Sequence, residues 1–195
     1  MPTALRTLQK NASEFFDEIH KHHSKEMQCG KGCSACCYTD LHIFESEAIE
    51  IVEYINSLPQ EERTKLISSF RSPPPGKDPT GRIQPPCSFL NKNQECVIYP
   101  ARPLICRTQG APLLFKLEES KKKKTDSIDH CPLNFKNKLP DRAHWIQLDR
   151  MNQLLSIAEK DYQIKEKQLI LDSIKDSNER ISLKKLKKWI TQNNE

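Results

Sequence analysis

The sequence predicts a mainly α-helical protein, with helices around an irregular cysteine-ligated metal centre and one or two short β-hairpins. Hydrophobic residues recur at helical spacing toward both ends of the chain. Of the 13 prolines, all but Pro2 lie between residues 59 and 140, where they interrupt regular structure. The eight cysteines begin at Cys29 and end at Cys131. The sequence shows no internal repeat and no regular alternation of strands with helices.

Three helices are expected in the first 70 residues. In residues 3–25, Leu5, Leu8 and Ile19 belong to an apolar stripe with a period close to 3.6. A second helix covers about 45–57 and ends before Pro59, because proline disfavours the helical conformation in the preceding residue. The third helix begins at Pro59, where no amide hydrogen is needed, and runs to about Phe70.

The middle of the chain predicts loops and short strands. Residues 71–81 are rich in proline and are expected to form a loop without regular structure. Residues 87–96 resemble a small hairpin that carries one cysteine on each arm, and Phe89 and Tyr99 are expected to pack beneath it. Short extended segments are expected at 38–44 and 111–117, and the lysine run 121–124 is expected to be an exposed loop.

The last part of the chain is predicted to be helical again. A helix over about 142–160 has a buried stripe that includes Met151 and Leu155, and one or two more polar helices follow within 162–192. We therefore expect a cysteine-cluster domain over 1–160, with its metal core at about 27–135. Residues 161–195 are expected to form a basic helical extension.

Composition indicates a reducing environment for the thiols. The N-terminus lacks the basic flank and apolar core of a secretory signal, and no apolar run reaches the roughly 18–20 residues of a membrane span. We therefore expect a cytoplasmic protein in which the cysteines are available for metal, because disulfides are uncommon there. Four disulfides, as in a secreted protein, are the alternative for an even count of eight cysteines.

The balance of hydrophobic and charged residues suggests a small core. Hydrophobic residues make up 36% of the chain and charged residues 29%. Metal ligation is expected to contribute to folding, because a structural zinc in a small peptide is worth about 10–16 kcal/mol. The net charge of +5 is concentrated in the lysine runs at 121–124 and 184–188. Such runs usually mark solvated surface, and a nucleic-acid contact is the alternative.

The cysteine spacing points to a metal centre. In Cys29-x3-Cys33-x2-Cys36-Cys37, a turn can direct several thiolates at one point, and three neighbouring exposed thiols would oxidise without metal. Soft thiolate ligands select zinc or iron–sulfur clusters over magnesium or calcium. The same spacing is also found in the cluster loop of radical SAM enzymes, but this chain lacks the length and alternation of their large barrel.

The motif, together with Cys87-Ser-Phe-Leu and Cys96-Val-Ile-Tyr-Pro-Ala-Arg-Pro-Leu-Ile-Cys106-Arg107, resembles the YkgJ-type cysteine cluster family of zinc- or iron-chelating proteins. The likeness covers roughly residues 27–135 and includes Cys131-Pro. It implies metal binding without defining the metal or an activity. The implied metal ligands are Cys29, Cys33, Cys36, Cys37, Cys87, Cys96, Cys106 and Cys131.

Other residues near these cysteines have two interpretations each. Side chains of adjacent residues diverge, so Cys37 serves a second metal or cluster iron, or is a small buried hydrophobe. Arg102 and Arg107 flank Cys106 and either donate to sulfur or form surface ion pairs. His22 and His23 suit the end of a helix and are reserve ligands.

Two hypotheses of function follow. The first is a non-catalytic protein holding an iron–sulfur cluster or zinc, with a structural, redox-sensing or metal-sensing role. An iron–sulfur cluster is slightly favoured, because adjacent cysteines can reach different irons. The second is an enzyme, or the redox partner of one, acting in protein lysine modification, since flagellin lysine N-methylases share a similar cluster. We find no acid–base pair or phosphate loop that favours the second.

Overall fold

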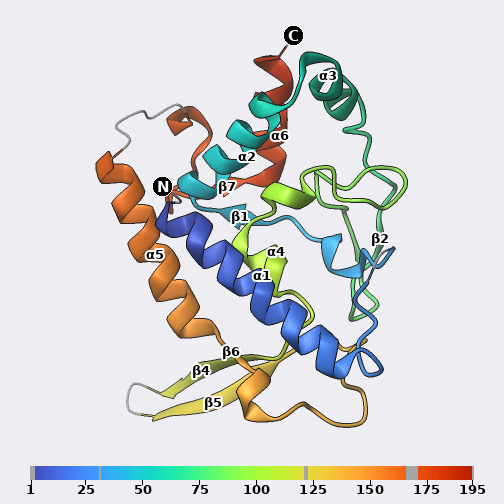
Figure 1. Cartoon of the computed structure of the whole chain (residues 1–195), viewed down its shortest axis with the longest axis vertical. Helices are drawn as coiled ribbons and strands as arrows, with labels where there is room; N and C mark the ends of the chain where they lie inside the picture. The colour runs from blue at the N-terminus through green and yellow to red at the C-terminus, as the bar shows by residue number, and fades with distance from the viewer. Residues whose placement is uncertain (1–2, 31, 121–122, 166–170, 195) are drawn as a thin grey trace. The chain divides into compact units, whose positions relative to one another are not determined.

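The computed structural model describes residues 3–30, 32–120, 123–165 and 171–194. Contacts divide the chain into two compact units. The first unit contains Met1–Gly30 and Leu104–Tyr162, and the second contains Lys31–Pro103 and Gln163–Glu195. Figure 1 follows the chain through the elements of both. The predicted domain boundary at residue 160 stays a prediction.

Helices α1 (Ala4–His23), α4 (Leu104–Thr108) and α5 (Leu148–Lys165) build the first unit, to which α5 contributes its residues up to Tyr162. The Thr3 hydroxyl caps α1 by accepting from the Arg6 amide at 3.1 Å. Leu5 and Ile19 of α1 are fully buried. The helix predicted over 3–25 is therefore confirmed.

A small sheet completes the first unit. Strands β4 (Leu113–Ser120) and β5 (Lys123–Asp129) form an antiparallel hairpin, and β6 (Ile146–Gln147) pairs parallel to β4 (Figure 1). The strand predicted at 111–117 is confirmed and is longer than expected. The lysine run is not simply a loop, because Lys123 and Lys124 belong to β5, while residues 121–122 lie outside the described part of the chain.

The helix predicted over 142–160 begins later, at Leu148. Residues Arg142–His144 form a 3-10 turn. Ile146 and Gln147 form strand β6 instead of a first helical turn, and the Ile146 amide donates to the Pro112 carbonyl at 2.8 Å. The Trp145 indole donates to the Pro140 carbonyl at 2.9 Å and stabilises the turn. From Leu148 onward the expected stripe is present, with Met151 and Leu155 buried.

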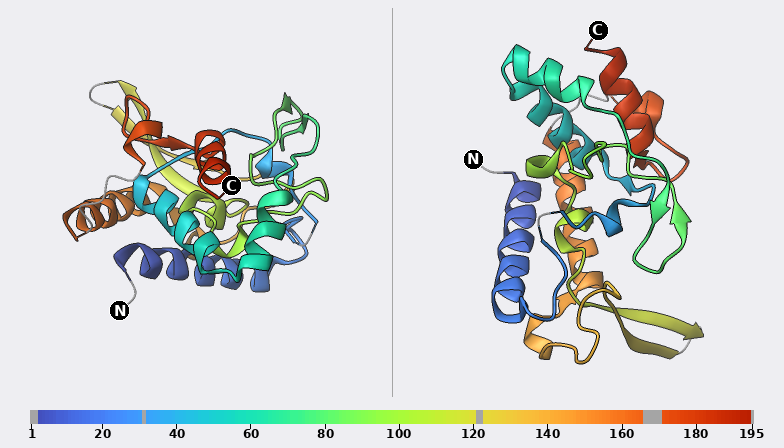
Figure 2. Two further views of the ribbon diagram at one scale, coloured as in Figure 1. Left: turned by 90° about the horizontal axis from the view of Figure 1, so that it is seen from above. Right: turned by 90° about the vertical axis from the view of Figure 1, so that its right-hand side faces the viewer.

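Helices α2 (Glu45–Ser57), α3 (Gln60–Ser68) and α6 (Leu183–Gln192) build the second unit. The first two agree with the predicted helices, and Pro59 precedes the first residue of α3. Strand β1 (His42–Ile43) lies in the segment predicted to be extended and pairs antiparallel with β7 (Ile181–Ser182). Figures 1 and 2 show α6 beside α2 in this unit.

The C-terminal tail has a buried face of its own. Leu183, Leu186 and Ile190 lie on one side of α6 and are at most 2% exposed. A 3-10 turn, Asp172–Ile174, precedes β7, and residues 166–170 of the predicted helical region lie outside the described residues. Helix α6 therefore packs more firmly than its many lysines suggest, because its apolar residues follow the helical period.

The proline-rich segment is more regular than expected. Strands β2 (Gly76–Lys77) and β3 (Ile83–Gln84) pair antiparallel around a turn at Asp78. The Asp78 carboxylate accepts from the hydroxyl and amide of Thr80 and from the amide and side chain of Arg82, at 2.6 to 3.0 Å. These hydrogen bonds, chiefly that from the Thr80 hydroxyl, lower the pKa of Asp78 to about 2.

The mainly α-helical class is confirmed, with six α-helices and small sheets in the ranges described above. The two hairpins, β2–β3 and β4–β5, match the expected number of short hairpins but not the expected location at 87–96. None of the described helices is both long and apolar enough to cross a membrane.

We predict that Lys175→Met destabilises the second unit by about 3 kcal/mol or more, because it leaves a buried carboxylate without its cation. Lys175 Nζ lies 2.8 Å from Glu45 Oε2, and the Glu45 side chain is only 5% exposed. Urea unfolding of the full chain measures this loss. The double variant Glu45→Leu/Lys175→Met is expected to recover part of it. A single variant as stable as the parent would contradict the prediction.

Candidate metal centre

A short turn presents two adjacent cysteines in the second unit. Residues Ala35–Cys37 form one 3-10 turn, in which the Cys37 amide donates to the Ser34 carbonyl at 2.8 Å. The side chains of Cys36 and Cys37 are hydrogen-bonded to each other. The turn therefore brings together two thiols that an extended segment would direct to opposite sides.

A second loop presents Cys87 and Cys96. The expected hairpin is reduced to a single bridge between Leu90 and Cys96, because the loop between them is held by side-chain hydrogen bonds. The Asn91 side chain accepts from the amides of Asn93 and Glu95, each at 2.9 Å. This Asx turn brings the two arms together without a regular ladder.

Buried apolar side chains anchor this loop to the core of the second unit. Phe89 and Ile98 are each 1% exposed, and the Phe89 ring meets Phe70 edge-on at 5.5 Å between centroids. Tyr99, which we expected to pack beneath the loop with Phe89, is instead 59% exposed. Its ring lies under the guanidinium of Arg102, 3.8 Å from the centroid. A cation–π contact at the surface thus replaces the expected burial.

Hydrogen bonds join the two cysteine-bearing segments directly. The Cys87 amide donates to the Cys37 carbonyl at 2.6 Å. The Ser34 hydroxyl donates to Oε1 of Gln94 at 2.7 Å. Segments 50 to 60 positions apart in the sequence are therefore fixed to each other at or near the residues that carry the thiols.

The pKa shifts show that these thiols influence one another. The hydrogen bond from the Cys37 thiol lowers the pKa of Cys36 to about 7. Burial raises the pKa of Cys87 to about 11, and negative charge on Cys96 and Cys36 adds to this increase. Burial also raises the pKa of Cys96, against the opposing effect of Arg102. We call Cys36, Cys37, Cys87 and Cys96 the thiol cluster.

Three further predicted ligands lie in the first unit. Cys29 follows α1, Cys106 is in α4, and Cys131 follows β5. Arg107, beside Cys106, donates to the Ser13 hydroxyl at 3.0 Å. Cys33 belongs to the second unit and is exposed.

Asn134, which the sequence did not single out, organises the surroundings of Cys29. Its side chain is fully buried and donates to Sγ of Cys29 at 3.1 Å and to the Gly110 carbonyl at 2.8 Å. The side-chain oxygen of Asn134 accepts from the Gln28 backbone amide at 2.7 Å. The backbone amide of Asn134 donates to the Cys131 carbonyl at 2.9 Å. The only signal in the sequence is a polar residue three positions after Cys131.

The reserve ligands make other contacts in the first unit. His22 lies 2.7 Å from a Glu18 oxygen, and Nε2 of His23 lies 3.0 Å from Nδ1 of His144. His20 donates to the Cys29 carbonyl at 2.9 Å. These histidines thus contribute to local structure at the end of α1.

The eight cysteines, all within the described residues, form no disulfide. Among the side chains that the structure describes, no group of three or more His, Cys, Asp or Glu residues already has a geometry that could hold a metal ion. The thiol cluster thus brings four sulfurs into one neighbourhood without arranging them as a complete coordination sphere. That all eight cysteines are ligands stays a prediction.

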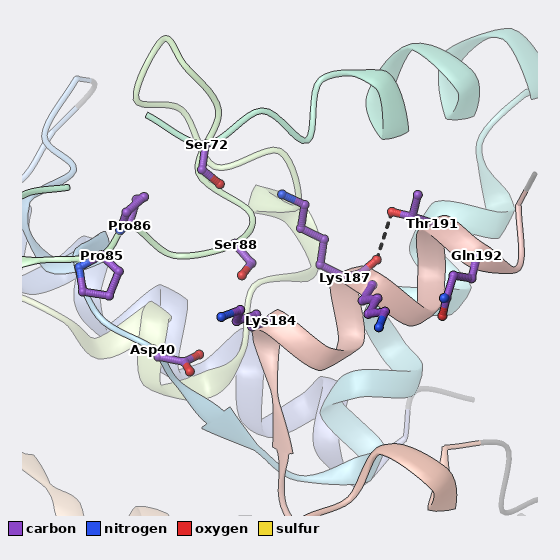
Figure 3. Close-up of a pocket in the computed structure, with 10 residues that line it drawn as sticks. Asp40, Ser72, Pro85, Pro86, Ser88, Lys184, Lys187, Thr191 and Gln192 are labelled. Carbon is purple, nitrogen blue, oxygen red and sulfur yellow. Dashed lines mark hydrogen bonds between the residues drawn. The ribbon is translucent and has the colours of Figure 1, made fainter. Parts of the chain in front are cut away.

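A groove of about 520 Å³ borders the thiol cluster in the second unit. Pro86 and Ser88, the neighbours of Cys87, line one part of it, and lysines of α6 line another (Figure 3). Lys187 is close enough for negative charge on Cys87 to raise its pKa, although burial of the amine lowers that pKa overall.

A cysteine-rich site on a mainly helical scaffold is typical of metal-chelating proteins. Residues 28–132 match the sequence model of the CxxCxxCC family, described as “Putative zinc- or iron-chelating domain”. The chain belongs to this family, in agreement with the resemblance noted from its motifs. No curated protein and no solved structure matches the chain.

We predict that Gly110→Ala disrupts the surroundings of Cys29. Gly110 has φ of +99°, and a Cβ at this position would collide with the Cys29 sulfur. The expected loss of stability is about 1–3 kcal/mol from backbone strain alone. Thermal unfolding followed by circular dichroism measures it. Gly30→Ala is the matched control, because nothing lies within 4 Å of a Cβ there. Equal effects of both variants would refute this account.

We also predict that the thiols of the reduced, metal-free chain ionise in separate pH ranges. Cys36, with its pKa lowered to about 7, should react with iodoacetamide at half its maximal rate near pH 7, because the thiolate is the nucleophile. Cys87, with its pKa raised to about 11, should remain slow up to pH 9. Tandem mass spectrometry of the alkylated peptides measures both rates. Identical pH profiles would show that the thiol cluster does not perturb its members.

Proposed function

We propose that this chain is a non-catalytic metal-binding protein whose zinc or iron–sulfur centre is built on the thiol cluster. The convergence of Cys36 and Cys37 with Cys87 and Cys96 is the observation that supports it. The other proposed ligands are Cys33, in the same unit, and Cys29, Cys106 and Cys131, in the first unit. The centre has a structural role, or it senses redox state or metal supply.

The donor chemistry of the thiol cluster fits such a centre. Zinc and iron–sulfur clusters share a preference for thiolate sulfur. Burial keeps protons on Cys87 and Cys96, so a cation that replaces those protons would offset the cost of burying negative sulfur. Because the four sulfurs are not already arranged as ligands, metal binding requires their side chains to rotate toward a common point. Binding is therefore coupled to local folding and to proton release.

We favour an iron–sulfur cluster over zinc. Cys36 and Cys37 are adjacent in one 3-10 turn. Adjacent thiolates are more easily accommodated when they can reach different irons than when they must share one zinc. Zinc in one or two cysteine-rich sites is the alternative.

An enzyme acting in protein lysine modification is the second candidate. The groove beside Cys87 favours it, because an active centre needs a cleft next to the metal. However, three lysines of α6 line this groove, and their positive charge would repel a lysine substrate. The non-catalytic role therefore remains the preferred proposal.

Metal analysis of protein purified without oxygen tests the proposal. We expect iron and sulfide in equal amounts and broad absorption near 400 nm, or stoichiometric zinc in a colourless protein.

Cys36→Ser and Cys87→Ser should each weaken metal retention more than about 100-fold, since loss of a ligand exceeds the 10–100-fold effect of losing a residue that only orients one. Ser88→Ala is the matched control, because it alters the neighbour of Cys87 without removing a thiol. Full metal retention in both cysteine variants would exclude the thiol cluster.

A further inference from the structure

The groove beside the thiol cluster has a strongly basic wall. Lys184, Lys187 and Lys188 of α6 line it, opposite a wall that includes Ser72 and Pro85. Figure 3 shows the α6 residues on one side of the groove and Ser72, Pro85 and Pro86 on the other. The volume of about 520 Å³ lies within the range of roughly 300–1,000 Å³ typical of small-molecule pockets.

Helical spacing explains why three lysines share this wall. Leu183, Leu186 and Ile190 direct the apolar face of α6 into the second unit, where all three are buried. Lys184, Lys187 and Lys188 then follow one another at i, i+3 and i+4 on another face. Lys185 of the same helix does not line the groove. The pKa of Asp176 is lowered chiefly by a hydrogen bond from the Arg180 amide, and the charge of Lys185 adds to that effect.

The residues that line the groove carry more positive than negative charge. Asp40 is the single carboxylate among the lining residues, against three ammonium groups. Like charges at i and i+4 of a helix destabilise it, so Lys184 and Lys188 repel each other unless an anion lies between them. The arrangement favours a ligand with more than one negative charge.

Lys187 is held in place before any ligand binds. Its Nζ donates to the Phe70 carbonyl at 2.6 Å and lies 5.7 Å from the centroid of the Phe70 ring. Partial burial lowers its pKa, so an anion in the groove would stabilise its charged form. An ammonium group that is already oriented loses less side-chain entropy when it binds an anion.

We propose that this groove binds a small molecule through a diphosphate group, with Lys184, Lys187 and Lys188 as the counter-charges. Lysine is a common partner of phosphate oxygens and acts as a point charge. The hydroxyls of Ser72 and Ser88 supply further donors from the opposite side. The bound group lies next to Cys87, so the anion and the thiol cluster share one electrostatic environment. This site is independent of which metal the thiol cluster holds.

Calorimetric titration of the full chain with inorganic pyrophosphate tests the site. We expect one equivalent to bind at low salt, and the double variant Lys184→Gln/Lys188→Gln to weaken binding about 100-fold, since each lost charge-assisted hydrogen bond corresponds to about tenfold. Both residues are exposed, so the variant should fold. Lys185→Gln, which removes the same charge from the same helix, should change the dissociation constant less than about twofold, because Lys185 does not line the groove and an exposed charge without direct contact to the anion contributes little.

Other results would overturn the proposal. Equal weakening by Lys185→Gln and by Lys184→Gln would show attraction to the general charge of α6. Binding of a single-stranded oligonucleotide without binding of pyrophosphate would assign the lysines to a nucleic-acid surface. Metal content measured before and after the titration must be unchanged, because heat that reflects metal stripped from the thiol cluster would count against the site. Loss of metal binding in a cysteine variant with pyrophosphate binding intact would affect the proposed function alone.

Discussion

The hydrogen bond from the Cys87 amide to the Cys37 carbonyl is the contact on which the candidate centre depends. The segments around these residues have little regular structure, so helix or sheet pairing cannot hold them together. The Ser34–Gln94 hydrogen bond and the buried Phe89 and Ile98 beneath the loop support the same junction. These contacts fix the two cysteine-bearing segments to each other and so support the arrangement that places four thiols together.

The thiols at this junction are shifted in opposite directions: burial disfavours ionisation of some, while a hydrogen bond favours ionisation of another. Burial favours the protonated thiols of Cys87 and Cys96, whereas the contact with Cys37 favours the thiolate of Cys36. The amine of Lys187 is also partly buried, and negative charge on Cys87 favours its protonated form. A metal in the thiol cluster and an anion in the groove would therefore act on the same local electrostatic balance from two sides.

Local patterns predicted the regular elements well and the irregular ones poorly. Helices α1, α2 and α3 lie close to their predicted ranges, because apolar period and proline position depend only on neighbours in the sequence. The β2–β3 hairpin was missed because it depends on the side chain of Asp78 within a proline-rich stretch. Tyr99 was placed incorrectly because its exposure follows from Arg102, whose position over the ring depends on the turn between them.

The sequence by itself determined the helical class, the family and the thiol chemistry, because spacing and residue type carry that information locally. Only the tertiary structure decided which cysteines become neighbours, that Asn134 and Gly110 surround Cys29, and that three lysines of α6 line a groove beside Cys87. Such neighbours arise from contacts between distant segments. They depend on how the chain closes its loops and buries its apolar faces, and spacing along the sequence does not encode that closure.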